Sequence, residues 1–229
     1  MRRSEINTAI EYVMRACRDE FRLPLPPFAY LTPDEWKGIG EDHREIVDNM
    51  LGWDVTDFGG DFKKTGLTSF VFRNGNVHKP EVYQKPYCEK LLYVMDSQIL
   101  PYHYHWNKME DIINRGGGRL SLTLYQAADD DGFSNEDVTI DVDGRNVTVP
   151  AGGSIVLSPG ESITLRPHQY HTWQAIPGEG DVMAFEVSKC NDDFTDNNFI
   201  DVGDRIPGVE EDEPARHLVY ADYKHYVTF

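Results

Sequence analysis

Three residues within a short stretch, His103, His105 and Glu110, are of the types that bind divalent metal ions. The residues around the two histidines are predicted to form a strand. Because successive side chains of a strand point to opposite faces, His103 and His105 project to the same side. Glu110 lies too far along the chain to share that straight strand, so the chain must turn near Asn107 to bring the carboxylate back. This stretch therefore predicts one wall of a metal site.

A fourth candidate ligand, His171, lies in the later segment 162–173, which we interpret as one strand. Ile163, Leu165, His171 and Trp173 share a parity, so the histidine is expected on an apolar face that points inward. Imidazole and carboxylate ligands together suit Mn, Fe, Zn or Ni, and they do not suit Ca or a thiolate site.

Three helical segments are predicted before the first strand. Apolar residues recur at three- and four-residue steps after Ser4, which is the expected N-cap. A second, short helix begins at Thr32, where a cap, a proline and a glutamate follow one another at the required positions. A third and weaker helical pattern covers 44–51. The stretch from Trp53 to Lys64 is rich in Gly and Asp and is interpreted as a loop.

From Leu67 onward the sequence has the alternation and the Gly, Pro and Asp-Gly turns of β structure. Short strands are expected at 67–73, 88–95, 99–106, 119–127, 138–142, 147–149, 154–157, 162–173 and 181–187. Regularly spaced short strands favour a closed or double-sheet β architecture, a jelly roll or barrel.

Two lysines are expected close to the metal ligands. A tight turn at 96–97 is predicted to join the strands on either side of it as a hairpin. The resulting register places Lys90 opposite His103 on one face. Lys108 lies between two of the candidate ligands in the sequence.

The composition limits the partners and the compartment. The chain has 229 residues, of which 40% are hydrophobic, enough for one sizeable domain with a packed core. Its 39 acidic residues against 22 Lys and Arg leave a net charge of -17, which opposes binding to nucleic acid or an anionic membrane. The three widely spaced cysteines are predicted to be buried thiols in a reducing compartment. No apolar run of signal-peptide or membrane-spanning length occurs, so we expect a cytoplasmic protein.

The four candidate ligands together resemble the two histidine-containing motifs of the cupin superfamily, whose four ligands hold one divalent metal inside a small β-barrel. The glycines at 116–118 follow the glutamate as the first of these motifs expects. The chain departs from the pattern at Ser97, where the first motif usually has a glycine. It also departs at His168 and Gln169, where the second motif usually has a glycine between proline and histidine.

Longer stretches resemble the D-lyxose isomerase family over nearly the whole chain. They are Arg-Ser-Glu-Ile-Asn near the N-terminus, Glu89-Lys90, the run His-Tyr-His-Trp-Asn-Lys-Met-Glu-Asp-Ile-Ile-Asn-Arg-Gly-Gly-Gly at 103–118, Arg-Pro-His-Gln-Tyr-His-Thr-Trp at 166–173, and Glu-Asp-Glu-Pro at 211–214. The resemblance implies a sugar isomerase that interconverts D-lyxose with D-xylulose and commonly D-mannose with D-fructose. It also implies a homodimer and one divalent ion per chain, usually Mn²⁺, with Co²⁺, Fe²⁺, Zn²⁺ or Ni²⁺ as alternatives.

The fold implied is mainly β, a cupin-type double-stranded β-helix (jelly-roll barrel) with N-terminal helices packed on it. We expect a single domain over 1–229, with a helical N-terminal extension at 1–65 and the barrel at 66–190. The C-terminal segment at 191–229 is expected to contribute to the site.

Aldose–ketose isomerisation needs a base near C1 and C2 that the metal does not consume. Glu213 in the acidic C-terminal motif matches the family's motif and is the expected base, with Glu211 as its rival. Outside the resemblance, a charged run of this kind is ordinarily a solvated face.

Lys90 and Lys108 are expected to bind the sugar and to stabilise its developing negative charge or shuttle protons. The alternative is an ordinary lysine whose stem packs along a strand. Arg216 and Trp106 complete the expected sugar contacts.

Two other functions are compatible with three histidines and one glutamate. One is a metal-dependent dioxygenase, since the same open coordination positions bind oxygen, and the other is a non-catalytic sugar-binding cupin. Lysines beside the metal and an additional carboxylate favour isomerisation, because oxygen chemistry requires no proton shuttle.

Overall fold

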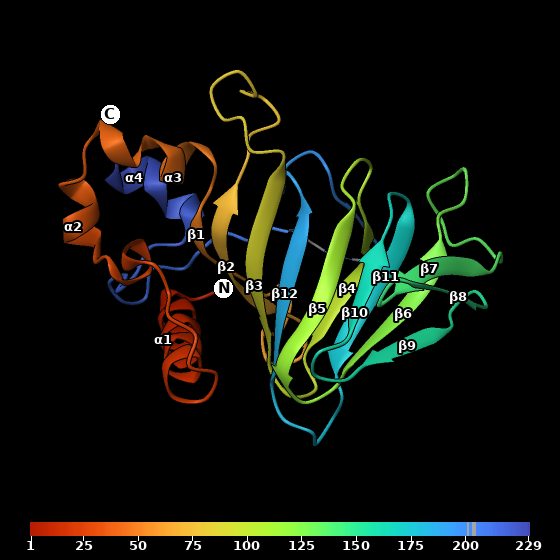
Figure 1. Cartoon of the computed structure of the whole chain (residues 1–229). Coiled ribbons are helices and arrows are strands. Elements are labelled where there is room, and N and C mark those ends of the chain that lie inside the picture. The colour runs from red at the N-terminus through yellow and green to blue at the C-terminus, as the bar shows by residue number, and fades with distance from the viewer. Residues whose placement is uncertain (201, 203–204) are drawn as a thin grey trace.

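The computed structural model describes residues 1–200, 202 and 205–229, and it is built on two antiparallel sheets (Figure 1). The strands are β1 (Gly52–Thr56), β2 (Leu67–Asn74), β3 (Tyr87–Val94), β4 (Ile99–Tyr104), β5 (Glu110–Gly117), β6 (Leu120–Gln126), β7 (Val138–Val142), β8 (Arg145–Val149), β9 (Ser154–Leu157), β10 (Ser162–Leu165), β11 (Gln169–Ala175), β12 (Val182–Lys189) and β13 (Asn198–Phe199). The larger sheet has the order β1-β2-β3-β12-β5-β10-β7-β8, and the smaller has the order β13-β4-β11-β6-β9. The expected jelly-roll architecture is confirmed.

Helices gather at the β1 end of the larger sheet, with the C-terminal segment beside them (Figure 1). They are α1 (Arg3–Asp19), α2 (Pro33–Lys37), α3 (Arg44–Asp48) and α4 (Tyr223–Tyr226), with 3₁₀ turns at Pro27–Tyr30, Glu41–His43 and Tyr220–Asp222. The apolar stripe of α1 packs on the outer face of the larger sheet, where Ile10 and Val13 join a core cluster with Phe70 and Leu91. The N-terminal helices therefore cover the barrel, as expected.

β3 has an apolar layer on each of its faces, which explains its continuous run of apolar residues. Leu92 and Val94 point into the barrel core, whereas Leu91 and Tyr93 point outward into the layer under α1. Because side chains alternate along a strand, Lys90 shares the inward face of Leu92 and Val94. Its ammonium group is thereby placed inside the barrel.

The predicted hairpin between the strands on either side of the turn at 96–97, which are β3 and β4, is wrong. The turn exists, since the backbone N–H of Gln98 donates to the Met95 carbonyl at 2.9 Å. However, β3 pairs with β2 and β12 in the larger sheet, while β4 pairs with β11 and β13 in the smaller. Lys90 therefore lies opposite Glu186, and His103 lies opposite His171. The chain crosses between sheets at this turn, which lets the inward faces of both strands share one core.

The segment 162–173 also divides between the two sheets, into β10 and β11. The corner lies around His168, whose φ of 62° is in the left-handed region that interrupts a strand.

Two further expectations are wrong in detail. The stretch after Gly52 forms the edge strand β1 instead of a continuous loop, and α1 begins one residue before Ser4, whose hydroxyl instead donates to Asp212 at 2.6 Å.

Candidate metal centre and active site

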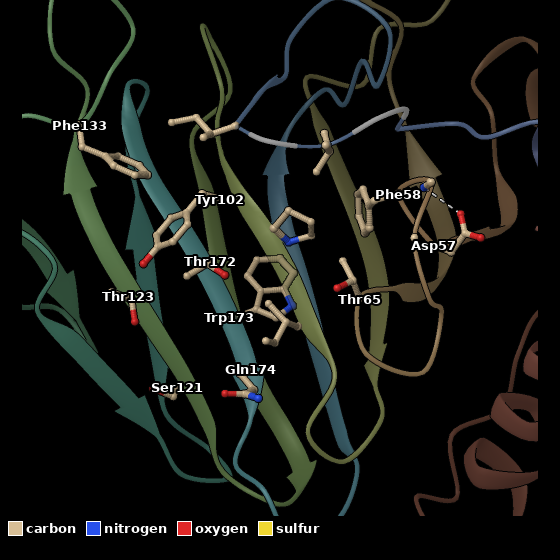
Figure 2. A pocket seen from close by; sticks show the side chains of 16 residues that line it. Asp57, Phe58, Thr65, Tyr102, Ser121, Thr123, Phe133, Thr172, Trp173 and Gln174 are labelled. Carbon is tan, nitrogen blue, oxygen red and sulfur yellow. Dashed lines mark hydrogen bonds between the residues drawn. The ribbon is translucent and has the colours of Figure 1, made fainter.

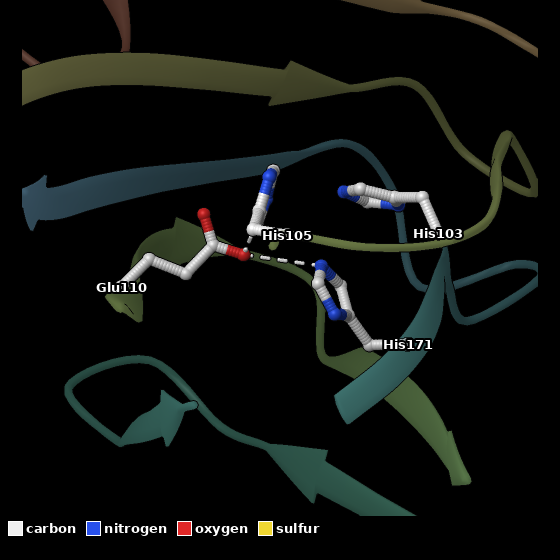
Figure 3. Close-up of side chains that lie close together, drawn as sticks. All are labelled: His103, His105, Glu110 and His171. Carbon is white, nitrogen blue, oxygen red and sulfur yellow. Dashed lines mark ion pairs between the residues drawn. The ribbon is translucent and has the colours of Figure 1, made fainter. Parts of the chain in front are cut away.

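Inside the barrel, His103, His105, Glu110 and His171 converge on one point (Figure 3). One candidate ligand atom from each lies within 4.8 Å of those of the other three, and all four residues are buried. His103 and His171 are direct cross-strand partners on β4 and β11. β5 begins at Glu110, so the predicted turn between the histidines and the glutamate is present.

Each histidine is oriented by a hydrogen bond on the far side of its ring. A backbone carbonyl can only accept a hydrogen bond, so Nδ1 carries the proton in all three rings and Nε2 is left with a lone pair. The Nδ1 bonds run from His103 to the Pro101 carbonyl at 3.1 Å, from His105 to the Asp196 carbonyl at 2.9 Å and from His171 to the Gln169 carbonyl at 3.0 Å.

The donor set fits a divalent cation. Nε2 of His105, Nε2 of His171 and Oε1 of Glu110 are buried and have no hydrogen-bond partner among the described residues. Oε1 of Glu110 lies 3.1 Å from Nε2 of His171 and 3.4 Å from Nε2 of His105. Because all three atoms carry lone pairs, their close approach is unfavourable unless a cation lies between them.

The ionisation states match those of metal ligands. Burial lowers the pKa of His103 well below its ordinary value, and the neighbouring His171 and His105 lower it further. Burial alone would raise the pKa of Glu110, but that pKa is held well below the usual range, chiefly by the positive charge of Lys108. A neutral imidazole and an ionised carboxylate are the forms that bind metal.

Two lysines and a second carboxylate lie beside the cluster. Lys108 Nζ lies 2.8 Å from Glu110 Oε2, and it donates to Glu186 Oε1 at 2.9 Å. Lys90 Nζ lies 3.5 Å from Glu186 Oε2 and donates to Asn191 Oδ1 at 2.6 Å. Lys90, Lys108 and Glu186 are all buried. A surface position is thus excluded for both lysines.

These opposite charges keep one another ionised. Burial alone would lower the pKa of Lys108, but Glu110 and Glu186 outweigh burial and raise it above the ordinary lysine value. Burial alone would raise the pKa of Glu186, yet Lys108 and Lys90 outweigh that too and lower it. The site therefore contains an ionised carboxylate that does not belong to the cluster of four.

A small cavity of about 40 Å³ lies over the cluster. Its walls include His103, His105, Glu110, both lysines and Glu186, together with Phe58, Leu67, Ser69, Leu92, Leu100, Trp173, Asp193, Asn197, Phe199 and Arg205. The ring of Phe199 stacks on His103, with their centroids 4.8 Å apart. Residues that follow β12 thus form one side of the enclosure.

A larger cavity of about 700 Å³ lies against the smaller sheet, and it includes none of the four clustered residues (Figure 2). Polar side chains on the outer face of that sheet, such as Ser121, Thr123 and Gln174, line it. Its size is therefore not a guide to where the chemistry lies.

The acidic motif of the C-terminal segment is placed elsewhere. Glu213 accepts from Asn7 on α1 at 2.7 Å and lies 3.3 Å from Arg216, while Glu211 pairs with buried Arg3. Arg216 is half exposed and also pairs with Glu11. The structure does not bring these residues to the cluster, because α1 holds them on the outer side of the larger sheet.

Trp106 does not line the cavity either. Its side chain is partly exposed and packs edge-on against Tyr104, with ring centroids 4.8 Å apart. Parity explains this position, because Trp106 follows His105 and points to the opposite side.

Sequence reasoning missed Glu186. The signal was present, since Val182 and Ala184 share its parity in the predicted strand and point into the core. An acidic residue on an inward apolar face is rarely tolerated without a buried partner. It was overlooked because its partners, Lys90 and Lys108, are far away in the sequence.

Comparison with known proteins shows the family and agrees with the fold. Residues 1–223 match the family model described as D-lyxose isomerase. The chain is 42% identical to a D-lyxose/D-mannose isomerase of Escherichia coli O157:H7, over 99% of this chain and 100% of that protein. It is 43% identical to one of Serratia proteamaculans, over 91% of this chain and 92% of that protein.

Solved structures with the same fold are more distant in sequence. The L-ribose isomerase of Acinetobacter sp. DL28, in complex with L-ribose, has a TM-score of 0.59 at 13% identity, covering 92% of this chain and 98% of that one. The L-ribose isomerase of Cellulomonas parahominis with L-psicose has a TM-score of 0.52 at 16% identity, covering 87% and 92%. Among the described residues, no helix combines the length and the apolar character needed to cross a membrane.

Proposed function

The chain belongs to the D-lyxose isomerase family and is a sugar isomerase, and on that premise we propose that it interconverts D-lyxose with D-xylulose and D-mannose with D-fructose. The reaction proposed is metal-assisted proton transfer between C1 and C2. The observation that carries it is an enclosed cavity in which a metal-ligand cluster adjoins an ionised carboxylate and two lysines. The names of the two curated relatives support these sugars.

We propose that His103, His105, Glu110 and His171 hold one divalent ion, Mn²⁺ foremost. The lone pairs left without partners support this assignment. When bound, such an ion supplies Lewis-acid polarisation of the sugar oxygens at the reacting carbons.

Glu186 is better placed than Glu213 to be the base. Its Oε1 already accepts from Lys108 and, at 2.7 Å, from Ser188. Among the described residues, Oε2 has only the longer contact with Lys90, so it is the oxygen proposed to take a proton from carbon. Glu213 remains the base expected from the sequence, and replacing each of the two glutamates decides between them.

The lysines are proposed to bind and orient the sugar and to stabilise charge. Lys108 Nζ lies between the cluster and Glu186, so its N–H groups can donate to a sugar oxygen that becomes negative. Lys90 Nζ is held by Asn191 on the other side of Glu186 and can return a proton to oxygen. Glu110 and Glu186 raise the pKa of Lys108, so this lysine acts as a cation.

We propose that the cover of the cavity moves when a sugar enters, because a volume of about 40 Å³ is small beside a pentose with ten non-hydrogen atoms. We propose that residues 191–199 open, and that the C-terminal segment contributes to the site through Asp193, Asn197 and Phe199. Amide hydrogen exchange at 191–199 should slow when a sugar binds; exchange unchanged by saturating sugar would contradict this.

The decisive experiment is turnover by the purified protein with Mn²⁺. D-lyxose and D-mannose should each yield the ketose on chromatography, chelator-treated protein should yield none, and added Mn²⁺ should restore activity. Solvent label should enter C1 of the ketose if a base removes the proton from C2 of the aldose. Absence of ketose contradicts the isomerase reaction, and full activity of metal-free protein contradicts the role of the ion.

We also propose a cytoplasmic homodimer in which 1–65, 66–190 and 191–229 form one domain. The family resemblance supports the dimer and the composition supports the compartment. Light scattering of the purified protein tests the first, and cell fractionation tests the second. A monomer across the micromolar range would contradict the dimer.

A further inference from the structure

Two buried hydrogen-bond donors beside the metal cluster have no use in the chemistry described above. Five buried side-chain polar atoms lack a hydrogen-bond partner among the described residues, and three of them belong to the metal cluster. The other two are Nε1 of Trp173 and Nη1 of Arg205. Both residues line the same small cavity as the cluster.

Unpaired buried donors are unfavourable in a folded protein and are correspondingly rare. Binding sites are one place where they persist, because a ligand supplies the missing acceptor. An N–H group accepts nothing and cannot bind a cation, so these two require an acceptor such as a hydroxyl oxygen. A sugar carries such an acceptor on each carbon.

Trp173 lies at the right distance from the cluster to meet the far part of a sugar. It follows His171 by two residues on β11 and points to the same face, about 6.6 Å along the strand. Its ring stacks beside that of His171, with centroids 5.8 Å apart. A sugar whose C1 and C2 lie at the cluster would extend over this ring with its later carbons.

Arg205 is fixed in place, and its Nη1 has no hydrogen-bond partner among the described residues. Nη2 donates to Asp54 at 2.7 Å and lies 3.5 Å from Asp193. The guanidinium carbon lies 5.8 Å from the centre of the Phe58 ring. The two carboxylates neutralise and orient the group, so Nη1 can donate without further ordering.

We propose that Trp173 and Arg205 donate hydrogen bonds to the sugar hydroxyls beyond C3, and so make the site specific for sugars that carry them. This assignment rests on the proposed function for the position of C1 and C2. The metal cluster would then recognise the reacting end of any aldose, and these two residues would recognise the length and configuration of its tail.

The test measures binding of an unreactive polyol to the Mn²⁺-loaded protein by calorimetry. D-arabinitol, the five-carbon polyol that D-lyxose yields on reduction, is compared with glycerol in the wild type, Trp173→Phe and Arg205→Lys. Lost hydrogen bonds should weaken D-arabinitol binding by roughly 3- to 10-fold for Trp173→Phe and roughly 10- to 100-fold for Arg205→Lys, with glycerol binding unchanged. Equal D-arabinitol affinity in all three proteins overturns the assignment.

Matched variants separate recognition from folding. Trp53 is equally buried, but its Nε1 donates to the Ala29 carbonyl at 2.9 Å, so Trp53→Phe should lower the melting temperature and leave D-arabinitol affinity intact. Trp173→Phe should instead weaken D-arabinitol binding without lowering the melting temperature, because it removes a donor that has no partner among the described residues. Arg119→Lys, at an exposed pair with Glu179, serves as the control for Arg205→Lys.

Activity assays then distinguish the two proposals. If D-arabinitol binding depends on Trp173 and Arg205 but D-lyxose is not isomerised, the recognition site stands and the proposed reaction fails. If D-lyxose is isomerised with the same kcat/KM in the wild type and both variants, the proposed function stands and the recognition site fails.

Discussion

Two groups of carboxylates lie on opposite sides of the larger sheet and have different surroundings. In the cavity, Glu110 and Glu186 are buried among two lysines and the three histidines. On the outer side, Glu211 and Glu213 sit at the edge of α1, each already bonded to a residue of that helix. The comparison shows that the count and spacing of acidic residues say little about reactivity. Their reactivity depends instead on which side of the sheet they lie and on whether a carboxylate oxygen lacks a hydrogen-bond partner.

The largest effect should separate the two groups by activity. Glu186→Gln should lower kcat by about 10²- to 10⁴-fold, since an amide cannot accept the carbon-bound proton. Metal content should be unchanged. Glu213→Gln should alter kcat by less than about 3-fold, because Glu213 contacts Asn7 and Arg216 away from the cluster. Steady-state kinetics with metal analysis check both, and the opposite ranking would restore Glu213 as the base.

The outer group should instead control stability. Arg3 is 1% exposed and forms two bidentate pairs, with Glu211 and Asp222. Arg3→Met should lower the free energy of unfolding by about 3–5 kcal/mol, because it leaves the buried Asp222 carboxylate unpaired. Denaturant unfolding measures this.

The neighbouring Arg2 provides a control for that loss, since its pair with Glu210 is exposed. Arg2→Ala should cost less than about 1 kcal/mol. If Arg3→Met lowers the free energy of unfolding no more than Arg2→Ala does, Arg3 acts only as a surface charge. Sugar affinity should be unchanged in both.

Arg216 gives a smaller and sharper test of where the sugar binds. It is about half exposed and pairs with Glu11 at 2.9 Å. Arg216→Ala should cost at most about 1 kcal/mol in stability and leave the KM for D-lyxose unchanged. A tenfold rise in KM would mean that the acidic segment reaches the sugar after all.

The smallest effect concerns pH. The hydrogen bonds from Arg3 lower the pKa of Glu211, with burial opposing them. Because the folded-state pKa is the lower one, this contribution is present above the ordinary glutamate pKa of about 4.3 and is lost as the pH falls through the folded value. Glu211→Gln should therefore flatten the decline of stability below about pH 5. Since Glu211 is half exposed, the difference should be roughly 0.2–1 kcal/mol, measured by urea unfolding at several pH values.

Prediction succeeded where the decisive relation was local. The alternation of His103 and His105 and the required turn before Glu110 follow from strand geometry over a few residues. The same alternation placed His171 on an inward face. Lys90 was correctly predicted beside the cluster but from a wrong hairpin, and its inward direction follows from its parity with Leu92 and Val94 alone.

Prediction failed where two sheets had to be told apart. A tight turn such as 96–97 can close a hairpin or carry the chain to the facing sheet, and both outcomes have the same local residues. The segment 162–173 likewise keeps one parity through a corner that divides it between sheets. The acidic motif at 211–214 was expected at the site because it matches the family's motif. Its partners on α1, about two hundred residues away in the sequence, hold it on the outer side of the sheet.

The sequence by itself determined the candidate metal-ligand set, the β class of the fold and the family, because ligand chemistry and side-chain alternation act over short spans. Only the tertiary structure decided which carboxylate lies beside the candidate ligands and which buried donors are left without a partner among the described residues. Glu186, Lys90 and Lys108 meet through strand pairing and barrel closure, and Arg205 reaches the cavity by its pairing with Asp54. Such encounters depend on core packing across the whole chain, which no short stretch of residues encodes.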